Sequence, residues 1–530
     1  MSYKLISLEG LYTTLKNRFT KDGFLSLKDL PHPSTLKDMN KATNRIIEAI
    51  KTNQKIVLIG DYDVDGVVST TIMKMFFDNI GIELKTIIPN RFRDGYGLSP
   101  KIIDKIRDYD LIITVDNGIS ALEASILAKE LNIELIITDH HIVPPKLPIA
   151  HSIINQKQSD CNFIFDEICG AQIAWYLISS LKIGLNLKID TKVYLSLVSI
   201  AIIADVMPLI HINRAMVISG LNLLSNSSLA SIRALKEHLN INNFRCDDIG
   251  FQIAPLINSA GRMEDASYGL DFLLSSNIYQ AKERLSKLIE FNEARKEMET
   301  FITKEAINKA NSDDSVIIVY GENWHEGVVG IVASRVSNHF SKPTIILSKE
   351  GDRLKGSGRS YGECDLFDIV NQSKKLLLGF GGHKMAVGLS IDIDNFNSFK
   401  ESLQKSFNQK NYKLDNIDKN IIGEIKLDLI DNKIIDILNE FEPYGNENSR
   451  PKFISYGLDV SHIDKMGKNR EHLKMILNQG KTYLSAIKFR YEDEIRVGDK
   501  VDIIFTINEN HFRGETTIQL LIEKVTICHL

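Results

Sequence analysis

The chain has little of what marks a secreted or membrane protein. Its five cysteines, at positions 161, 169, 246, 364 and 528, form no Cys-x-x-Cys pair, which argues against a structural zinc site and a disulfide framework. No apolar run reaches the ~18 residues that a membrane span needs, and the first residues lack the sustained apolar core of a signal peptide. We therefore expect a cytoplasmic protein with no membrane segment.

An excess of positive charge is also missing. The chain has 64 Lys and Arg against 68 Asp and Glu, which gives a formal net charge of −4. This excludes a general polycation, since nonspecific affinity for nucleic acid comes from basic side chains that neutralise phosphates. It leaves room for a local basic stripe. With 43% hydrophobic residues, the 530-residue chain can fill roughly three or four domain cores.

The N-terminal half does contain short polar clusters, each placed directly after an apolar run. The runs at 55–59, 111–114 and 135–138 are rich in Ile and Val, as in strands buried on both faces of a parallel sheet. The functional crevice of an open α/β sheet lies at the carboxyl ends of its strands, so one crevice can collect all the clusters. The clusters are Gly60-Asp61-Tyr62-Asp63-Val64-Asp65-Gly66, Val115-Asp116-Asn117-Gly118 and Asp139-His140-His141.

These clusters predict a divalent-metal site. If the chain after the first strand stays extended, Asp61, Asp63 and Asp65 project to one side, and close carboxylates repel one another unless a cation neutralises them. Carboxylate oxygens with imidazole suit Mg²⁺ or Mn²⁺. A further acid, Asp205, follows the uncharged stretch 193–204, where it is either an unfavourable buried charge or another metal ligand. A lone DxD is more often a solvated turn, but clusters at successive strand ends favour the metal.

The motifs DYDVDG, VDNG and DHH, followed by the acid in IIADVMPL, resemble the four signature motifs of the DHH phosphoesterase superfamily. Its members hydrolyse phosphoanhydride or phosphodiester bonds with two Mn²⁺ or Mg²⁺ ions. Further segments resemble, in order, those of the RecJ family of 5′→3′ single-stranded-DNA exonucleases, from about residue 50 almost to the C terminus. They include PNRFRDGYGLS (89–99), NSAGRM (258–263), WHEGVVGIVASR (324–335), KGSGRS (355–360), GFGGHKMAVGLS (379–390) and FEPYGNENSRPKF (441–453).

The resemblance and the residue patterns together predict an α/β fold with a parallel-sheet DHH domain. A long helix would join it to a second α/β domain of the DHHA1 type, and an OB-like β-barrel would follow. The helix is indicated by a charged stretch without Pro or Gly, and the barrel by short alternating segments. The expected parts are a helical N-terminal preamble (1–50), the DHH metal-binding catalytic domain (51–270), the connecting helix (271–312), the DHHA1 substrate-binding domain (313–414) and the OB-like nucleic-acid-binding domain (415–530).

The resemblance implies two-metal hydrolysis of single-stranded DNA to 5′-mononucleotides. Asp63 would bind one cation, Mn²⁺ or Mg²⁺, and Asp116 would bridge it to a second. That second cation would be held by Asp65, His140 and Asp205. Asp61, Asp116, His140 and His141 are the expected catalytic residues, with Asp61 and His141 acting beside the metals.

Substrate contacts are expected on two domains. The resemblance implies that Arg359, His383, Gly381 and Gly382 hold the 5′-terminal phosphate, although a Gly-rich segment by itself is more often a simple turn. Arg262 and Ser357 are further expected substrate-binding residues. On the barrel, the basic residues Lys465, Lys468, Arg470 and Lys474 lie in one ten-residue stretch, and the first three would contact the strand. Phe489, Tyr491 and Phe512 are stacking candidates, although aromatic residues in strands are usually core. The expected partner is single-stranded DNA, with a single-strand-binding protein and a helicase as candidate protein partners of a monomer.

Three alternatives stay open from the sequence. One is a DHH phosphoesterase acting on nanoRNA, phosphoadenosine phosphate or a cyclic dinucleotide, which usually lacks the barrel. Another is a non-catalytic single-strand-binding scaffold, whose known examples lose metal ligands, and the third is a pyrophosphatase of the same superfamily. The choice between DNA and RNA also stays open, because contacts to a 2′-hydroxyl leave no local sequence pattern.

Overall fold

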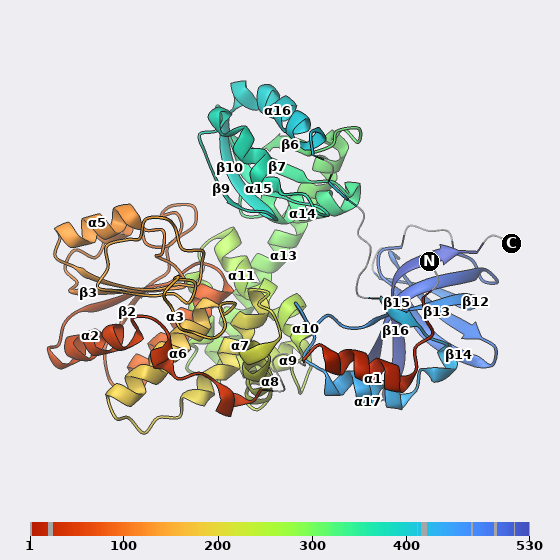
Figure 1. The fold of residues 1–530 in the computed structure, drawn as a ribbon, viewed down its shortest axis with the longest axis horizontal. Coiled ribbons are helices and arrows are strands. Elements are labelled where there is room, and N and C mark those ends of the chain that lie inside the picture. The colour runs from red at the N-terminus through yellow and green to blue at the C-terminus, as the bar shows by residue number, and fades with distance from the viewer. Residues whose placement is uncertain are drawn as a thin grey trace.

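The computed structural model of the chain describes residues 3–19, 25–410, 412–414, 421–467, 470–491, 495–512 and 515–528. Its strands form three sheets, and a long helix leads from the first α/β body to the second (Figure 1). The predicted fold class is confirmed: a parallel-sheet domain, a connecting helix, a second α/β domain and a C-terminal barrel.

The first sheet is parallel throughout, in the order β2-β1-β3-β4-β5. Every residue of β1 and β3 is buried, as their continuous apolar runs predict. Helices α2, α3 and α6 pack on one face of the sheet, and α4 and α5 pack on the other. The bounds are α2 (Met39–Lys51), β1 (Ile56–Ile59), α3 (Val64–Asn79), β2 (Lys85–Ile87), α4 (Pro100–Asp104), β3 (Leu111–Val115), α5 (Leu122–Glu130), β4 (Glu134–Thr138), β5 (Ser152–Ile154) and α6 (Gly170–Gly184).

A helical layer extends this core. Helix α7 is almost entirely buried within it, and the long helix α13 leaves it toward the second α/β domain (Figure 1). No single helix in the described ranges is long and apolar enough to cross a membrane, although α8 and α9, bent by 83°, pass that test as a pair by length and composition. The bounds are α7 (Leu195–Ala204), α8 (His211–Ser225), α9 (Ala230–Leu239), α10 (Cys246–Asp248), the π-helix η4 (Ile249–Ile253), α11 (Ala254–Met263), α12 (Ser267–Leu273) and α13 (Ile278–Lys309).

The second sheet has the order β6-β7-β8-β10-β9, and only β6 and β7 run parallel. Helix α14 covers the β6 and β7 half of one face, while α15 and α16 cover the opposite face. Helix α14 also packs against Ser357 and Arg359 of β8, so the open part of the first face lies over β9, β10 and the rest of β8. The bounds are β6 (Ile317–Glu322), α14 (Val329–Phe340), β7 (Thr344–Glu350), β8 (Arg353–Arg359), α15 (Leu366–Gln372), β9 (Gly379–His383), β10 (Ala386–Asp392) and α16 (Phe396–Asn408).

The third sheet closes on itself because β12 pairs with both β13 and β15. The short strand β11 adds to β12 in parallel, and α17 packs against the barrel core. The bounds are β11 (Ile421–Glu424), α17 (Asn432–Glu440), β12 (Lys452–Met466), β13 (His472–Gln479), β14 (Thr482–Lys488), β15 (Lys500–Phe512) and β16 (Glu515–Ile527). Single-turn 3-10 helices occur at η1 (Leu27–Asp29), η2 (Pro33–Thr35), η3 (Thr191–Tyr194), η5 (Lys374–Leu376), η6 (Ile393–Asn395) and η7 (Leu427–Leu429).

Within the expected preamble 1–50, the described stretches 3–19 and 25–50 contain two α-helices, and these do not form a unit of their own. Helix α1 (Leu8–Asn17) buries Leu11 and Leu15 in the core of the barrel domain, beside α17 (Figure 1). Helix α2 instead belongs to the core of the first α/β domain. The chain therefore starts on the C-terminal domain before it enters the first sheet.

Candidate metal centre and strand-binding cleft

The first polar cluster lies where β1 ends and α3 begins. Asp63 is the N-cap of α3 and accepts a hydrogen bond from the Gly66 N–H at 3.2 Å, and Asp65 lies in the first helical turn. The chain therefore does not stay extended as far as Asp65, because an apolar run that favours the helix follows the capping aspartate. The close packing requires a glycine at Gly66, where a Cβ would lie 2.5 Å from the backbone nitrogen of Asp61.

Asp65 is fixed by the N-terminus of α6. Its two carboxylate oxygens accept hydrogen bonds from the Gly170 N–H at 2.6 Å and the Ala171 N–H at 2.8 Å. A helix N-terminus has free N–H groups and a partial positive charge, so it suits a carboxylate. Gly170 also packs against the next cluster, since a Cβ there would lie 2.6 Å from the Cβ of Asp116.

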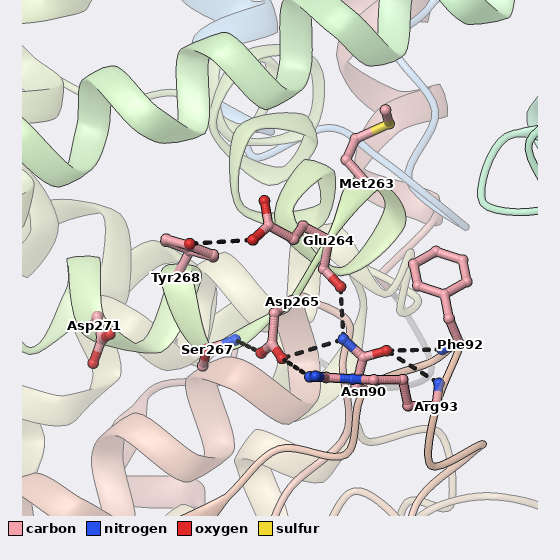
Figure 2. A pocket seen from close by; sticks show the side chains of 9 residues that line it. All are labelled: Asn90, Phe92, Arg93, Met263, Glu264, Asp265, Ser267, Tyr268 and Asp271. Atoms are coloured by element: carbon pink, nitrogen blue, oxygen red, sulfur yellow. Dashed lines mark hydrogen bonds and ion pairs between the residues drawn. The ribbon is translucent and has the colours of Figure 1, made fainter.

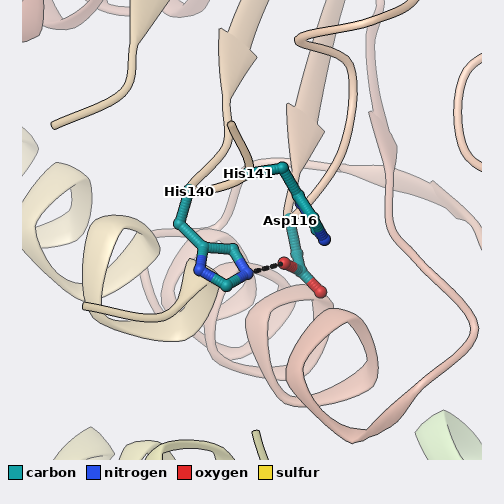
Figure 3. A group of neighbouring side chains, drawn as sticks. All are labelled: Asp116, His140 and His141. Atoms are coloured by element: carbon teal, nitrogen blue, oxygen red, sulfur yellow. Dashed lines mark ion pairs between the residues drawn. The ribbon is translucent and has the colours of Figure 1, made fainter. Parts of the chain in front are cut away.

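Asp116 and His140 come together at the ends of β3 and β4 (Figure 3). His140 Nε2 lies 3.2 Å from Asp116 Oδ1, 3.6 Å from Asp205 Oδ2 and 3.7 Å from Asp65 Oδ2. Burial lowers the pKa of His140, which keeps its imidazole neutral and able to bind a metal. Asp116 itself has a φ of 62°, a conformation that aspartate tolerates better than most residues.

His141 lies beside this group, and its ring is held by Asp139. Its Nδ1 donates to Asp139 Oδ1 at 2.7 Å, and its Nε2 lies 3.4 Å from the Tyr96 hydroxyl. Burial acts to lower the pKa of His141, but the hydrogen bond and charge of Asp139 outweigh it and raise that pKa to about 9. Asp139 thereby fixes the ring orientation, as carboxylates often do for histidines beside metals.

The acids of the cluster are crowded and short of hydrogen-bond donors. Burial raises the pKa of Asp61, Asp63 and Asp116, and neighbouring carboxylates raise each further. The same causes raise the pKa of Asp205 to about 8. Asp61 Oδ1, Asp116 Oδ1 and Asp205 Oδ2 are buried without a hydrogen-bond partner. Such a group is stable only if cations neutralise it.

The ligand atoms fit divalent cations. Three overlapping groups have donor atoms that all lie within 4.8 Å of one another: Asp65, His140 and Asp205; Asp61, Asp63 and Asp116; and Asp116, His140 and His141. The first is the set expected for one ion, and Asp116 occurs in both of the others. Asp61 and His141, both expected beside the metals, each belong to a donor group. Carboxylate oxygens, alone or together with imidazole nitrogens, suit Mn²⁺ or Mg²⁺.

The open part of the second sheet faces this centre across a cleft. On β8, β10 and β9, residues in one row point to the same face, because paired residues across a sheet share a side. One row is Ser357, Gly388 and Gly381, and the next is Arg359, Ala386 and His383. A cavity of about 410 Å³ is lined by Tyr62, Arg91 and Tyr96 on the first domain and by Lys355, Ser357, Gly379, Gly381, Gly388 and Ser390 on the second.

Three guanidinium groups gather near this cleft. Arg91 lies over the ring of Tyr62 at 5.4 Å, and Arg359 Nη1 donates to Ser357 Oγ at 2.8 Å. Burial lowers the pKa of Arg262 to about 10, and the charges of Arg91 and Arg359 contribute to that shift. No carboxylate in the described part of the chain forms a salt bridge with any of the three. This corner therefore has uncompensated positive charge suited to an anion.

Two predicted contact residues lie differently from expectation. Gly382 alternates to the opposite face of β9, where a Cβ would collide with the carbonyl oxygen of Ala386, so a glycine is required there by packing. The segment around it is an edge strand rather than a turn. His383 is exposed in the Arg359 row, and among the described residues neither it nor Gly382 lines the cavity.

The barrel carries the predicted basic residues on and beside β12 and β13. Lys465 lies over the ring of Tyr491 at 5.5 Å, and Lys474 follows on the neighbouring strand. Arg470 is exposed in the connection between the two strands, whereas Lys468 lies outside the described residues. Phe489 is 53% exposed and available for stacking, and the side chain of Phe512 is also outside the described set.

Arg91 and Tyr96 are site residues that sequence reasoning did not single out, and Asp139 was named in its cluster without a role. A second cavity, of about 660 Å³, shows how the Arg91 loop is fixed (Figure 2). Asn90 donates to the Glu264 carbonyl at 2.7 Å and to Asp265 at 3.2 Å, so it ties the loop to the junction between α11 and α12. The one sequence signal that could have identified Arg91 and Tyr96 is their place inside the segment 89–99, which resembles a segment of the RecJ family.

Comparisons with known proteins agree with this architecture. Family models match as the DHH family N-terminal domain (residues 55–202), the DHHA1 domain (313–409) and the RecJ OB domain (421–524). The chain is 31% identical to the single-stranded-DNA-specific exonuclease RecJ of Haemophilus influenzae, over 98% of this chain and 96% of that protein.

Two solved structures are similar. RecJ of Thermus thermophilus in complex with Mn²⁺ superposes with a TM-score of 0.83 at 24% identity, over 99% of this chain and 76% of that one. An exonuclease RecJ bound to manganese superposes with a TM-score of 0.63 at 29% identity, over 71% of this chain and 95% of that one. The sequence match over nearly the whole of both chains and the shared domain set show that the chain belongs to the RecJ family.

Proposed function

We propose that the chain is a metal-dependent exonuclease that hydrolyses single-stranded DNA from its 5′ end to 5′-mononucleotides, in DNA repair and recombination. One observation carries the proposal. A cluster of buried carboxylates with unpartnered oxygens lies beside a cleft between the two α/β domains. Three arginines that form no salt bridge in the described chain gather near it, Arg91 and Arg262 from the first domain and Arg359 from the second. The first group suits cations and the second suits a phosphate.

The metal ligands are assigned from the donor groups. Asp65, His140 and Asp205 would hold one divalent cation, Mn²⁺ or Mg²⁺, while Asp63 and Asp61 would hold a second, with Asp116 between the two. When bound, such ions lower the pKa of a coordinated water and neutralise charge on the scissile phosphate. The relatives that were solved with Mn²⁺ support this choice of metal.

The protein groups around the ions orient the substrate. Asp139 holds the His141 ring so that its Nε2 faces the Tyr96 hydroxyl at the cleft, where His141 can donate to a phosphate oxygen. Gly381 and Gly388 have no atom within 4 Å of the position of a Cβ, so this part of the second domain is a flat platform that a backbone can approach closely. Catalysis by Asp61, Asp116, His140 and His141 is thus combined with positioning from the opposite domain.

The arginine corner gives the reaction its direction. Arg91, Arg262 and Arg359, with Ser357 and Gly381 beside them, would bind the terminal 5′ phosphate, and His383 stands in the same row as Arg359. A strand seated there by its end places its first phosphodiester toward the carboxylate cluster. Bidentate guanidinium contacts supply both affinity and orientation for a phosphate.

The barrel favours a long single strand over a small nucleotide as the substrate. OB-type barrels bind single strands through basic grooves and aromatic side chains, and Lys465, Arg470 and exposed Phe489 are available here. Lys468 would extend the same basic stretch. A non-catalytic scaffold is disfavoured because every expected metal ligand is present and close together. A single-strand-binding protein and a helicase are the proposed protein partners of a monomer acting in the cytoplasm.

Digestion of 5′-labelled and 3′-labelled single strands tests the proposal. The protein is first stripped of metal, and each strand is then offered with Mn²⁺, Mg²⁺ or EDTA, alongside a duplex of the same sequence. We expect labelled mononucleotide from the 5′ label at once, only late release of the 3′ label, and no reaction in EDTA. Full activity after stripping, or early release of the 3′ label, would contradict it.

A further inference from the structure

The turn that carries Asp205 has an unusual backbone. Asp205 is the C-cap of α7, and the next two N–H groups turn back onto the helix: Val206 donates to the Ile203 carbonyl at 3.2 Å and Met207 donates to that of Ile202 at 3.1 Å. These bonds form the Schellman motif, in which the residue after the cap takes a left-handed conformation. Here that residue is Val206, with a φ of 54°.

Valine is poorly suited to this position. Glycine normally fills it, and a β-branched residue at positive φ is a genuine outlier that persists only when its surroundings hold it. Burial of the side chain does not offer compensation, because Val206 is 65% exposed. The turn must therefore be held through its backbone.

The C-terminal domain holds the turn through Asn446. The Asn446 side-chain amide donates to the Val206 carbonyl at 2.8 Å, and its own carbonyl accepts from the Leu209 N–H at 2.8 Å. Its neighbour Gly445 is close to the same segment, since a Cβ there would lie 2.6 Å from Leu209 Cδ1. Asn446 thus contacts the backbone on both sides of the residues that follow Asp205.

The loop that presents Asn446 is itself rigidly built. Buried Asn448 donates to the carbonyls of Phe441 at 3.0 Å and Pro443 at 2.9 Å. Arg214, on α8 of the first domain, donates to the Glu442 carbonyl at 2.8 Å. The loop between α17 and β12 is therefore fixed on both sides, so that Asn446 can hold the turn after Asp205 in one position.

We propose that Asn446 is a positioning residue for Asp205, so that the C-terminal domain completes the metal centre as well as contacting the strand. The inference rests on the proposed function, because it takes Asp205 as a ligand in the group with Asp65 and His140. The Val206 carbonyl that Asn446 holds lies in the peptide joining Val206 to Met207, one residue after Asp205. A change in this turn would therefore shift the end of α7, and with it the Asp205 carboxylate that lies 3.6 Å from His140 Nε2.

The test measures Mn²⁺ binding to the metal-stripped 530-residue chain by isothermal titration calorimetry. Asn446→Ala removes the amide donor, and outer-shell partners of this kind change metal affinity by about 10- to 100-fold. We expect Mn²⁺ affinity to fall about tenfold or more. The matched control is Asn439→Ala, an exposed asparagine on α17 of the same domain, which should bind Mn²⁺ like the wild type.

A second variant separates positioning from general damage. Val206→Gly lets the turn adopt its positive φ freely, so adding it to Asn446→Ala should recover most of the lost affinity. Wild-type affinity in Asn446→Ala, an equal loss in Asn439→Ala, or no recovery with Val206→Gly would each overturn the inference. A wild-type protein that binds no Mn²⁺ would instead overturn the proposed function, so the two failures are distinguishable.

Discussion

Replacing Arg359 by alanine is the sharpest test of how the cleft sets the direction of digestion. Arg359 lies on β8 beside the open platform, and burial together with the charge of Arg91 lowers its pKa. Its Nη1 donates to Ser357 Oγ at 2.8 Å and to the Gly358 carbonyl at 2.9 Å, which fixes the guanidinium plane. No carboxylate among the described residues is paired with it, so the charge is available to an incoming phosphate.

The size of the effect follows from this geometry. A charge-assisted hydrogen bond contributes about 1.5–3 kcal/mol, and every ~1.4 kcal/mol is a factor of ten. Removing Arg359 should therefore lower kcat/KM on 5′-phosphorylated strands by about 10- to 100-fold. Strands with a 5′ hydroxyl lack the bound group, so their loss should be clearly smaller. Arg359→Lys keeps the charge without the planar fork and should fall between the two.

The assay compares kcat/KM for the same single strand with a 5′ phosphate and with a 5′ hydroxyl. Arg353→Ala is the matched control, because Arg353 lies on the same strand and is exposed at its far end. It should leave both rates unchanged. Equal losses on the two strands in Arg359→Ala would refute the phosphate clamp, and so would an equal loss in the control.

The other predictions concern the site, its supporting loop and the barrel. Gly170→Ala should weaken Mn²⁺ binding in calorimetry, because a Cβ there would lie 2.6 Å from the Cβ of Asp116, and wild-type affinity would contradict the packing argument. Burial acts to raise the pKa of Asp265, but hydrogen bonds from Ser267 and Asn90 and the charge of Arg93 leave it lowered. The stability that Asp265 contributes is therefore present above about pH 4, the unfolded pKa, and is lost as pH falls through the folded value. The Tm gap between wild type and Asp265→Ala should close below about pH 4, and a gap that widens there would reverse the sign. Charge reversal of Lys465, Arg470 and Lys474 should weaken the binding of long strands, measured by fluorescence anisotropy. The slope of the logarithm of affinity against the logarithm of salt concentration should become shallower by about two. An unchanged slope would show that the barrel has only a structural role.

Sequence reasoning succeeds where a local pattern determines the outcome. The runs that become β1, β3 and β4 are continuous and apolar, which predicts strands buried in a parallel sheet, and the polar clusters then meet at one edge. The charged stretch without Pro or Gly likewise predicts the long helix α13. These features depend on a few consecutive residues.

Sequence reasoning fails where contacts between residues far apart in the sequence determine the structure. Asp65 was expected on an extended chain, yet Asp63 caps α3 and Asp65 finds the N-terminus of α6, more than a hundred positions away. The preamble is divided between two cores because Leu11 meets residues of the barrel domain. Contacts such as Asn446 with Val206 join domains, and no local pattern marks them.

The central claim is a pair of cations held around Asp116, and counting them tests it most directly. Metal-stripped wild type and Asp116→Ala are dialysed against excess Mn²⁺, and bound metal per chain is measured by elemental analysis, with circular dichroism as the check on folding. The account predicts two ions per wild-type chain and fewer in a folded Asp116→Ala protein that no longer digests single strands. A wild type without bound Mn²⁺, or a variant that keeps both ions and its activity, would contradict it.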